Sequence, residues 1–241
     1  MKFLDIDSPL MQGLSKVADL MILNLLTIVC CLPVITVGPA LTALNYMALK
    51  MVRNEEGYIA RAFFKSFKEN LRQGIMIWLL FLLAALVLVF DYFIMGSTET
   101  QMAGIGQILV GVAAIFVIST ALYAFPLLAK FKNSIGTTLK NALLVSMMQF
   151  PKTVLMFVMY LIPMLIFIYF FEMIPFVLFF GFSVPAWVSA KLYNKFFQKL
   201  EDKYWESQGG KPTAEEKNEG EEDVRIFRDE LDSTLQDKTL E

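Results

Sequence analysis

The sequence contains no histidine, and only two of its 241 residues are cysteine. The absence of histidine excludes catalytic triads that use histidine as the base, most imidazole metal sites and the commonest proton relay. Cys30 and Cys31 are adjacent within apolar sequence, so they cannot link distant segments, and they lack the spacing of a zinc site. We therefore predict that the protein is not an enzyme and has no catalytic, cofactor-binding or metal-binding residues.

Charged residues are also scarce, at 18% of the chain against 56% hydrophobic residues. A soluble domain carries about 25% charge, so this composition indicates an integral membrane protein. Residues 201–241 contain fourteen Asp or Glu against six Lys or Arg, whereas residues 1–200 contain nine against fifteen. We predict an N-terminal segment at 1–16, which lacks the basic start of a signal peptide, a transmembrane domain at 17–200 and an acidic tail at 201–241.

Long apolar segments predict an all-α, polytopic membrane fold. A helix rises about 1.5 Å per residue and the hydrocarbon core is about 30 Å thick, so a crossing needs about 20 largely apolar residues. The segments that meet this requirement are 17–52 (interrupted), 75–95, 102–129, 153–171 and 174–190. We therefore predict about five transmembrane helices.

The distribution of Lys and Arg predicts the orientation of these spans, because basic residues near span ends favour the cytoplasmic side. The loops at 96–101 and around Glu172 contain no Lys or Arg, whereas the other connectors do: 50–72, 130–152 and 191–199. The two uncharged loops should therefore face outside, and the acidic C-terminal tail should be cytoplasmic. The side of the N-terminus stays open, because residues 1–19 hold two lysines against three aspartates.

The chain also resembles itself. A shift of 79 residues aligns "RNEEGYIAR" (53–61) with "KNSIGTTLK" (132–140), so that a basic residue, Asn, Gly and a second basic residue coincide. The same shift aligns the second span with the fourth. This pattern predicts parallel repeat units at 23–95 and 102–174, with an extra span at 174–190. Each unit would contain a span, an in-plane amphipathic cytoplasmic helix and a second span.

Two prolines and a glycine interrupt the first apolar segment, in "CCLPVITVGPALTAL" (30–44). Pro33 and Pro39 lack an amide donor and Gly38 adds backbone freedom, so the helix should break there and release carbonyls that lipid cannot satisfy. The pattern favours a kink that fits an overlong helix into the bilayer. A discontinuous helix lining a binding cavity, with Asn45 nearby, is the second hypothesis. The third is a re-entrant hairpin, which would make six passes or put the N-terminus inside.

The first connector is predicted to form a basic amphipathic helix. Its apolar stripe recurs every four residues, at Ile59, Phe63, Phe67 and Leu71, and its basic residues lie on the opposite side: Arg61, Lys65, Lys68 and Arg72. Such a helix suits the anionic headgroups at the cytoplasmic surface, with its phenylalanines buried there, or a partner protein. Because membrane segments flank it on both sides, we expect no role in binding nucleic acid.

Few ionisable residues lie within the apolar segments, and these are functional candidates by default: Asp19, Asp91 and Glu172. We expect them to lie near the outer interface, with a coupling or substrate role as the alternative. Asn24, Asn45 and Gln107 are expected to form hydrogen bonds between helices.

In the tail, 207–223 is typical of a flexible linker, and a short helix beginning at Val224 has an apolar stripe suited to docking.

Three stretches together resemble the YesL-like family of small bacterial integral membrane proteins, a domain of unknown function: "CCLPVITVGPALTALNYMALKMVRNEEGYIARAFFKSFKENLRQG", "YAFPLLAKFKNSIGTTLKNALL" and "RIFRDE". The resemblance covers roughly residues 14–230. It implies a protein of the bacterial plasma membrane whose gene often neighbours genes for sugar ABC transporters and glycan degradation. It implies no catalytic residue.

Two functional hypotheses follow. The first is a non-enzymatic accessory or regulatory component of bacterial carbohydrate (oligosaccharide) uptake, which contacts transporter subunits through its basic cytoplasmic connectors. The second is a small independent permease with a site at the broken first helix, formed by Pro33, Gly38, Pro39 and Asn45. The substrate and the oligomeric state are not encoded in any motif that we recognise.

Overall fold

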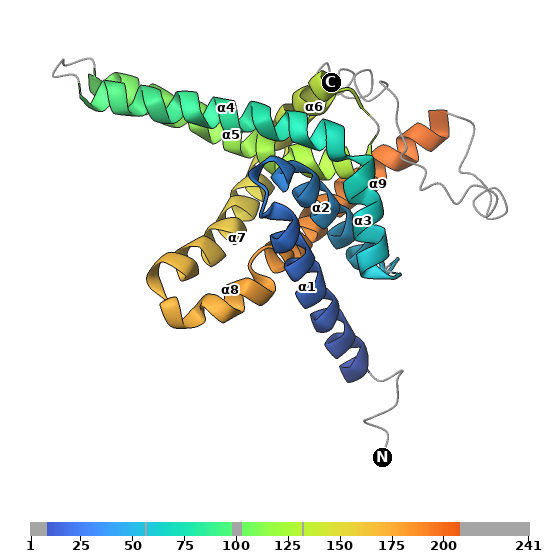
Figure 1. The fold of residues 1–241 in the computed structure, drawn as a ribbon. Helices are drawn as coiled ribbons and strands as arrows, with labels where there is room; N and C mark the ends of the chain where they lie inside the picture. The colour runs from blue at the N-terminus through green and yellow to red at the C-terminus, as the bar shows by residue number, and fades with distance from the viewer. Residues whose placement is uncertain (1–8, 56, 98–102, 132, 208–241) are drawn as a thin grey trace.

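The computed structural model describes residues 9–55, 57–97, 103–131 and 133–207, and these residues form helices without any strand (Figure 1). The predicted all-α fold is therefore confirmed. The expected linker and short helix of the tail lie almost wholly outside the described residues. The elements in chain order are α1 (Pro9–Cys31), η1 (Val34–Thr36), α2 (Val37–Arg53), α3 (Ile59–Glu69), α4 (Leu71–Gly96), α5 (Ala103–Lys130), α6 (Ile135–Met148), α7 (Phe150–Tyr169), η2 (Phe171–Met173), α8 (Ile174–Phe180) and α9 (Ser183–Ser207).

Several helices are long and apolar enough to cross a membrane, so the protein is a multi-pass membrane protein. Within the described residues there are four such segments, Gly13–Cys31, Leu71–Gly96, Gly104–Lys130 and Phe150–Tyr169. The α8 and α9 helices form a fifth if they are counted as one broken span, since they meet at an angle of 46°. The number of candidate spans agrees with the sequence prediction, but the predicted last span is bent rather than straight.

The sequence pattern favoured a kinked span for the first apolar segment. In the structure this segment forms a hairpin. The Lys16 ammonium group, near the start of α1, donates a hydrogen bond of 2.7 Å to the Asn54 side chain, just after the end of α2. The two helices therefore run antiparallel, and the chain reverses at η1. The kink prediction was wrong because prolines and glycine mark where a helix stops, and they do not fix the direction in which the chain continues.

Thr36 satisfies part of the backbone at the turn of this hairpin. The Thr36 hydroxyl group donates to the carbonyl oxygens of Cys30 at 2.7 Å and Pro33 at 2.8 Å, and the Thr36 amide also donates to Pro33. These bonds occupy carbonyls that the break in the helix releases. The neighbouring side chains are apolar and exposed, with relative exposures of 75% for Leu32, 63% for Val34 and 51% for Ile35. The turn is thus compatible with an apolar environment.

The buried core lies at one end of the molecule. Its main contributors are α2, the last two turns of α5, and the middle of α9, with the rings of Phe131 and Phe197 stacked edge to face at 5.3 Å. The α4 and α5 helices then continue away from this core as a long antiparallel pair, and α7 and α8 form a second arm (Figure 1). In the α4 helix only Gly74 and Ile77 are buried. The arms therefore present apolar side chains outward, as lipid-facing helices do.

Element boundaries recur at the spacing of the predicted repeat. The α3 helix ends at Glu69 and α6 ends at Met148, and the following helices begin at Leu71 and Phe150, each pair 79 residues apart. Both following helices are preceded by a buried amide side chain, Asn70 and Gln149. The assignment of repeat units 23–95 and 102–174 stays a prediction.

Candidate functional site

The break between Pro33 and Pro39 is closed by close packing against α4. A methyl group added at Gly38 would collide with the Gly74 carbonyl oxygen and lie 2.7 Å from Trp78 Cβ, and one added at Gly74 would lie 2.8 Å from the Pro39 nitrogen. The two backbones are therefore in direct contact, which only glycine permits. Pro33 instead lies exposed on the turn. Among the predicted cavity residues, Pro33 thus belongs to the turn. Gly38 and Pro39 belong to the contact between α2 and α4.

Asn45 lies six residues beyond Pro39 on α2, about 9 Å further along the helix axis. Its amide group donates to the Leu41 carbonyl at 2.8 Å, and its side-chain oxygen accepts a bond of 3.3 Å from the Tyr193 hydroxyl group on α9. Both Asn45 and Tyr193 are buried. Asn45 therefore joins two helices, as the sequence predicts for an intramembrane amide, and it lies away from the turn.

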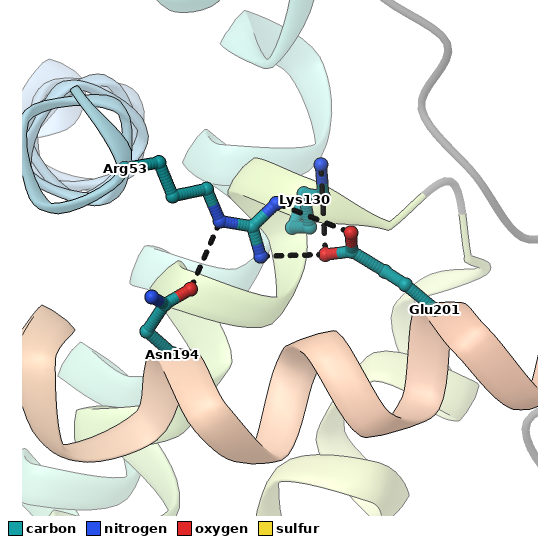
Figure 2. Close-up of polar contacts among 4 residues, drawn as sticks. All are labelled: Arg53, Lys130, Asn194 and Glu201. Carbon is teal, nitrogen blue, oxygen red and sulfur yellow. Dashed lines mark hydrogen bonds and ion pairs between the residues drawn. The ribbon is translucent and has the colours of Figure 1, made fainter. Parts of the chain in front are cut away.

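A larger polar cluster joins the ends of α2, α5 and α9, and we call Arg53, Lys130, Asn194 and Glu201 the polar lock (Figure 2). The Arg53 guanidinium group donates to both carboxylate oxygens of Glu201, at 3.1 and 2.7 Å, and its Nε donates to Asn194 at 2.9 Å. Lys130 Nζ lies 3.6 Å from the same carboxylate. The side chains of Arg53, Glu201 and Lys130 are only 9, 13 and 21% exposed, so water screens the pairs weakly.

The polar lock was missed from the sequence. Glu201, which the charge distribution assigns to the acidic tail, belongs to α9 and pairs with the membrane domain. One signal was available, because Asn194 ends the stretch "AKLYN", which is similar to "AKFKN" at 129–133 and to the Asn that follows Arg53. Sequence similarity indicates equivalent positions, but it does not indicate that Arg53 and Asn194 touch each other.

A second polar contact closes the break between α8 and α9, and it comes from Asn24, which the sequence predicted to form hydrogen bonds between helices without identifying its partners. The Asn24 amide group on α1 donates to the Leu178 carbonyl at 2.6 Å, and its oxygen accepts from the backbone amides of Phe182 at 2.7 Å and Ser183 at 2.9 Å. One buried side chain therefore serves both broken ends, the last carbonyls of α8 and the first amides of α9. The signals in the sequence were Gly181 and Pro185, which favour a helix stop and a helix start.

The predicted basic helix is present as α3, and Arg61, Lys65 and Lys68 are exposed on it, with Arg72 exposed at the start of α4. We call these four residues the basic face. The opposite side differs from the prediction: Ile59 and Phe63 are buried against α1 and α2. Phe63 therefore lies in the protein core and not among lipid headgroups. An amphipathic pattern identifies an apolar side without identifying what covers it.

The acidic candidates are spread over separate elements. Asp19 is half-buried on α1, Asp91 is half-buried in the last turns of α4, and Glu172 is exposed in η2. Among the described residues, no group of three or more Cys, Asp or Glu side chains is placed to hold a metal ion. A coupling role for these three carboxylates stays a prediction.

The comparison with family models supplies one match. Residues 20–92 match the family described as "Protein of unknown function, DUF624". The chain is therefore similar to this family over these residues. The DUF624 match extends from α1 through the hairpin, Arg53 and the basic face to the last turns of α4. The YesL-like resemblance is consistent with this match. Comparisons with curated proteins and with solved structures found no match.

Proposed function

We propose that this protein is a non-enzymatic accessory or regulatory component of bacterial carbohydrate uptake, located in the plasma membrane with its C-terminus in the cytoplasm. The observation that carries the proposal is the basic face, which is exposed on a helix whose apolar side is buried in the protein. The link to carbohydrate uptake comes from the YesL-like resemblance, which implies gene neighbours that encode sugar ABC transporters. The expected partners are subunits of such a transporter.

The basic face has the properties of a docking surface. Its helix is fixed to the body through Ile59 and Phe63, so a partner would bind a surface that is already ordered. Its charges lie at the end of the molecule that also contains the polar lock, because Gln73 at the start of α4 donates to the Asn133 backbone just after α5. By the positive-inside rule this end is cytoplasmic. An acidic surface on a transporter subunit would complement it.

The structure gives less support to the independent permease. Its expected site was the break at Pro33–Pro39, where Gly38 and Pro39 contact Gly74 backbone to backbone. Asn45 is engaged by Tyr193 on α9. A substrate at the break would have to separate α2 from α4.

The experiment is an affinity pull-down of the tagged protein from native membranes in mild detergent, followed by mass spectrometry. We expect wild type to recover permease subunits of a sugar transporter, and we expect the triple variant Lys65→Ala, Lys68→Ala, Arg72→Ala to recover several-fold less, because complementary charge is lost. The matched control is Lys195→Ala, Lys199→Ala, which removes exposed basic residues from α9 and should leave recovery unchanged.

Equal recovery by the triple variant and wild type would contradict docking through the basic face. Recovery of the protein alone would contradict the accessory role, and sugar flux into liposomes that contain only this protein would then test the permease. Membrane insertion of every variant is checked by alkaline extraction, so that loss of recovery is not confused with loss of folding.

A further inference from the structure

We infer that the α1–α2 hairpin does not cross the bilayer, and that it lies within a single leaflet at the end of the molecule where α4 begins, with acyl chains of that leaflet against its exposed apolar face. Length and composition allow α1 to be a span. The contacts of the hairpin indicate instead that α1 does not cross the bilayer. The inference is independent of any partner protein.

The start of α4 marks a membrane interface. Arg72 is exposed in the first turn of α4, and the helix that follows is almost wholly apolar up to Asp91. A guanidinium group in the hydrocarbon region is costly, so Arg72 must lie at or near the headgroups. Gln73 Nε2 donates to the Asn133 carbonyl at 3.1 Å, which places the chain leaving α5 at the same level.

Both ends of α2 touch this same level. At its first turn, Gly38 contacts Gly74, two residues after Arg72, and Trp78, one turn further. At its last residue, Arg53 binds Glu201, whose carboxylate also lies 3.6 Å from Lys130 at the end of α5. The α2 helix is 17 residues long, which corresponds to about 24 Å from first to last residue. A helix of this length with both ends at one level lies across the ends of α4 and α5.

The α1 helix returns to the same level at its other end, because Lys16 is hydrogen-bonded to Asn54. The turn between α1 and α2 adjoins the first two turns of α4, about 9 Å or less from Arg72 along its axis, whereas a crossing needs about 30 Å. The hairpin therefore begins, turns and ends near one interface.

The surface of the hairpin suits lipid. The large exposed side chains of α1 are apolar and fall on one side of the helix, at Leu14, Val17, Ile22, Leu25 and Val29, and the turn adds exposed Leu32, Val34 and Ile35. The opposite side of α1 is buried against the protein through Leu20, Leu23 and Asn24. Thr36 occupies the carbonyls of Cys30 and Pro33, so these two groups need no water. A helix with this pattern can lie in the plane of one leaflet.

The test uses single cysteines in a Cys30→Ala, Cys31→Ala background, each labelled with bimane and reconstituted in vesicles. The positions are Ser15 at the start of α1, Val34 at the turn and Ser97 at the far end of α4. The vesicles carry brominated phosphatidylcholine in the outer leaflet only, and an impermeant aqueous quencher applied to the Ser15 and Ser97 labels measures the two orientations.

We expect the fraction of Val34 label quenched by the brominated leaflet to follow the fraction of Ser15 label that faces outward. A quenched fraction that follows Ser97 instead would overturn the inference, because the turn would then lie in the opposite leaflet. Impermeant maleimide on intact membranes gives a second measurement: reaction of the Val34 cysteine from the face that exposes the Ser97 cysteine would also overturn it. Labelling of all three variants in detergent confirms that each cysteine reacts when lipid is removed.

Discussion

Asn24 and Gly38 show how single residues hold this molecule together. Neither is charged, and each acts on the backbone of another helix. Asn24 replaces the hydrogen bonds that α8 and α9 lose at their break, and Gly38 lets α2 approach α4 until their backbones touch. In an apolar environment, neither a free backbone amide nor a poor helix contact can be compensated by water.

Replacing Asn24 with Leu should destabilise the protein by about 2–4 kcal/mol, because the amides of Phe182 and Ser183 and the Leu178 carbonyl would lose their partner. The measurement is the free energy of unfolding in detergent. Thr120→Val is the control, since the Thr120 hydroxyl group bonds only to Phe116 in its own helix, and it should cost less than about 0.5 kcal/mol. Equal effects of the two substitutions would show that Asn24 does not stabilise the break.

Replacing Gly38 with Ala should cost several kcal/mol, roughly 3 or more, because the new methyl group would collide with the Gly74 backbone, which cannot rotate away. Gly111→Ala on α5 is the matched control. A methyl group at Gly111 meets nothing within 4 Å, so this change should be neutral or stabilise by up to about 1 kcal/mol through helix propensity. Thermal unfolding of both variants in the same detergent tests the prediction, and a Gly38→Ala protein as stable as Gly111→Ala contradicts it.

At the scale of elements, the two connector helices are fixed in different ways. The α3 helix buries Ile59 and Phe63, whereas the buried residues of α6 are largely polar. The side-chain amides of Asn141 on α6 and of Asn133 and Gln149 at its ends are buried without a hydrogen-bond partner. Buried amides of this kind cost about 1–3 kcal/mol each relative to paired ones.

The polar lock should couple α2 to α9 energetically. A double-mutant cycle with Arg53→Ala and Glu201→Ala should give a coupling energy of about 1–3 kcal/mol, because the bond is bidentate and mostly buried. The exposed pair of Lys16 and Asn54 provides the comparison and should give less than about 1 kcal/mol. A coupling energy near zero for Arg53 and Glu201 would mean that their ion pair does not stabilise the contact between α2 and α9.

At the scale of the whole molecule, the sequence predicts elements better than it predicts their arrangement. Hydrophobic length correctly identified the long helices, because burial in lipid needs a minimum apolar length wherever the helix packs. The reversal at η1 depends on Lys16 meeting Asn54 and on Gly38 meeting Gly74, and pairings between distant residues leave no local signal. The same reason explains why the polar lock was missed, and why Asn24 was predicted to bond to another helix without its partners on α8 and α9 being identified.

The position of the basic face could be predicted, whereas the surroundings of its helix could not. Periodicity assigned Arg61 and Lys65 to one side and Phe63 to the other, as the structure has them. It could not distinguish lipid from protein as the cover for Phe63, because both are apolar. The cavity role of Pro33 and Asn45 stays a prediction, and the Gly38 and Asn45 contacts show that a broken helix can be closed by its neighbours as well as by a ligand.

The polar lock also has a consequence for biosynthesis. Arg53 is made 148 residues before Glu201, and its other lock partner on α9, Asn194, also appears late. At 5–20 residues per second the ribosome needs roughly 7–30 s to cover this distance. During that interval neither Glu201 nor Asn194 is available to Arg53, although the α1–α2 hairpin has already been synthesised. The polar lock can therefore form only after most of the chain has been made, so the pairing of α2 with α9 is a late step of assembly.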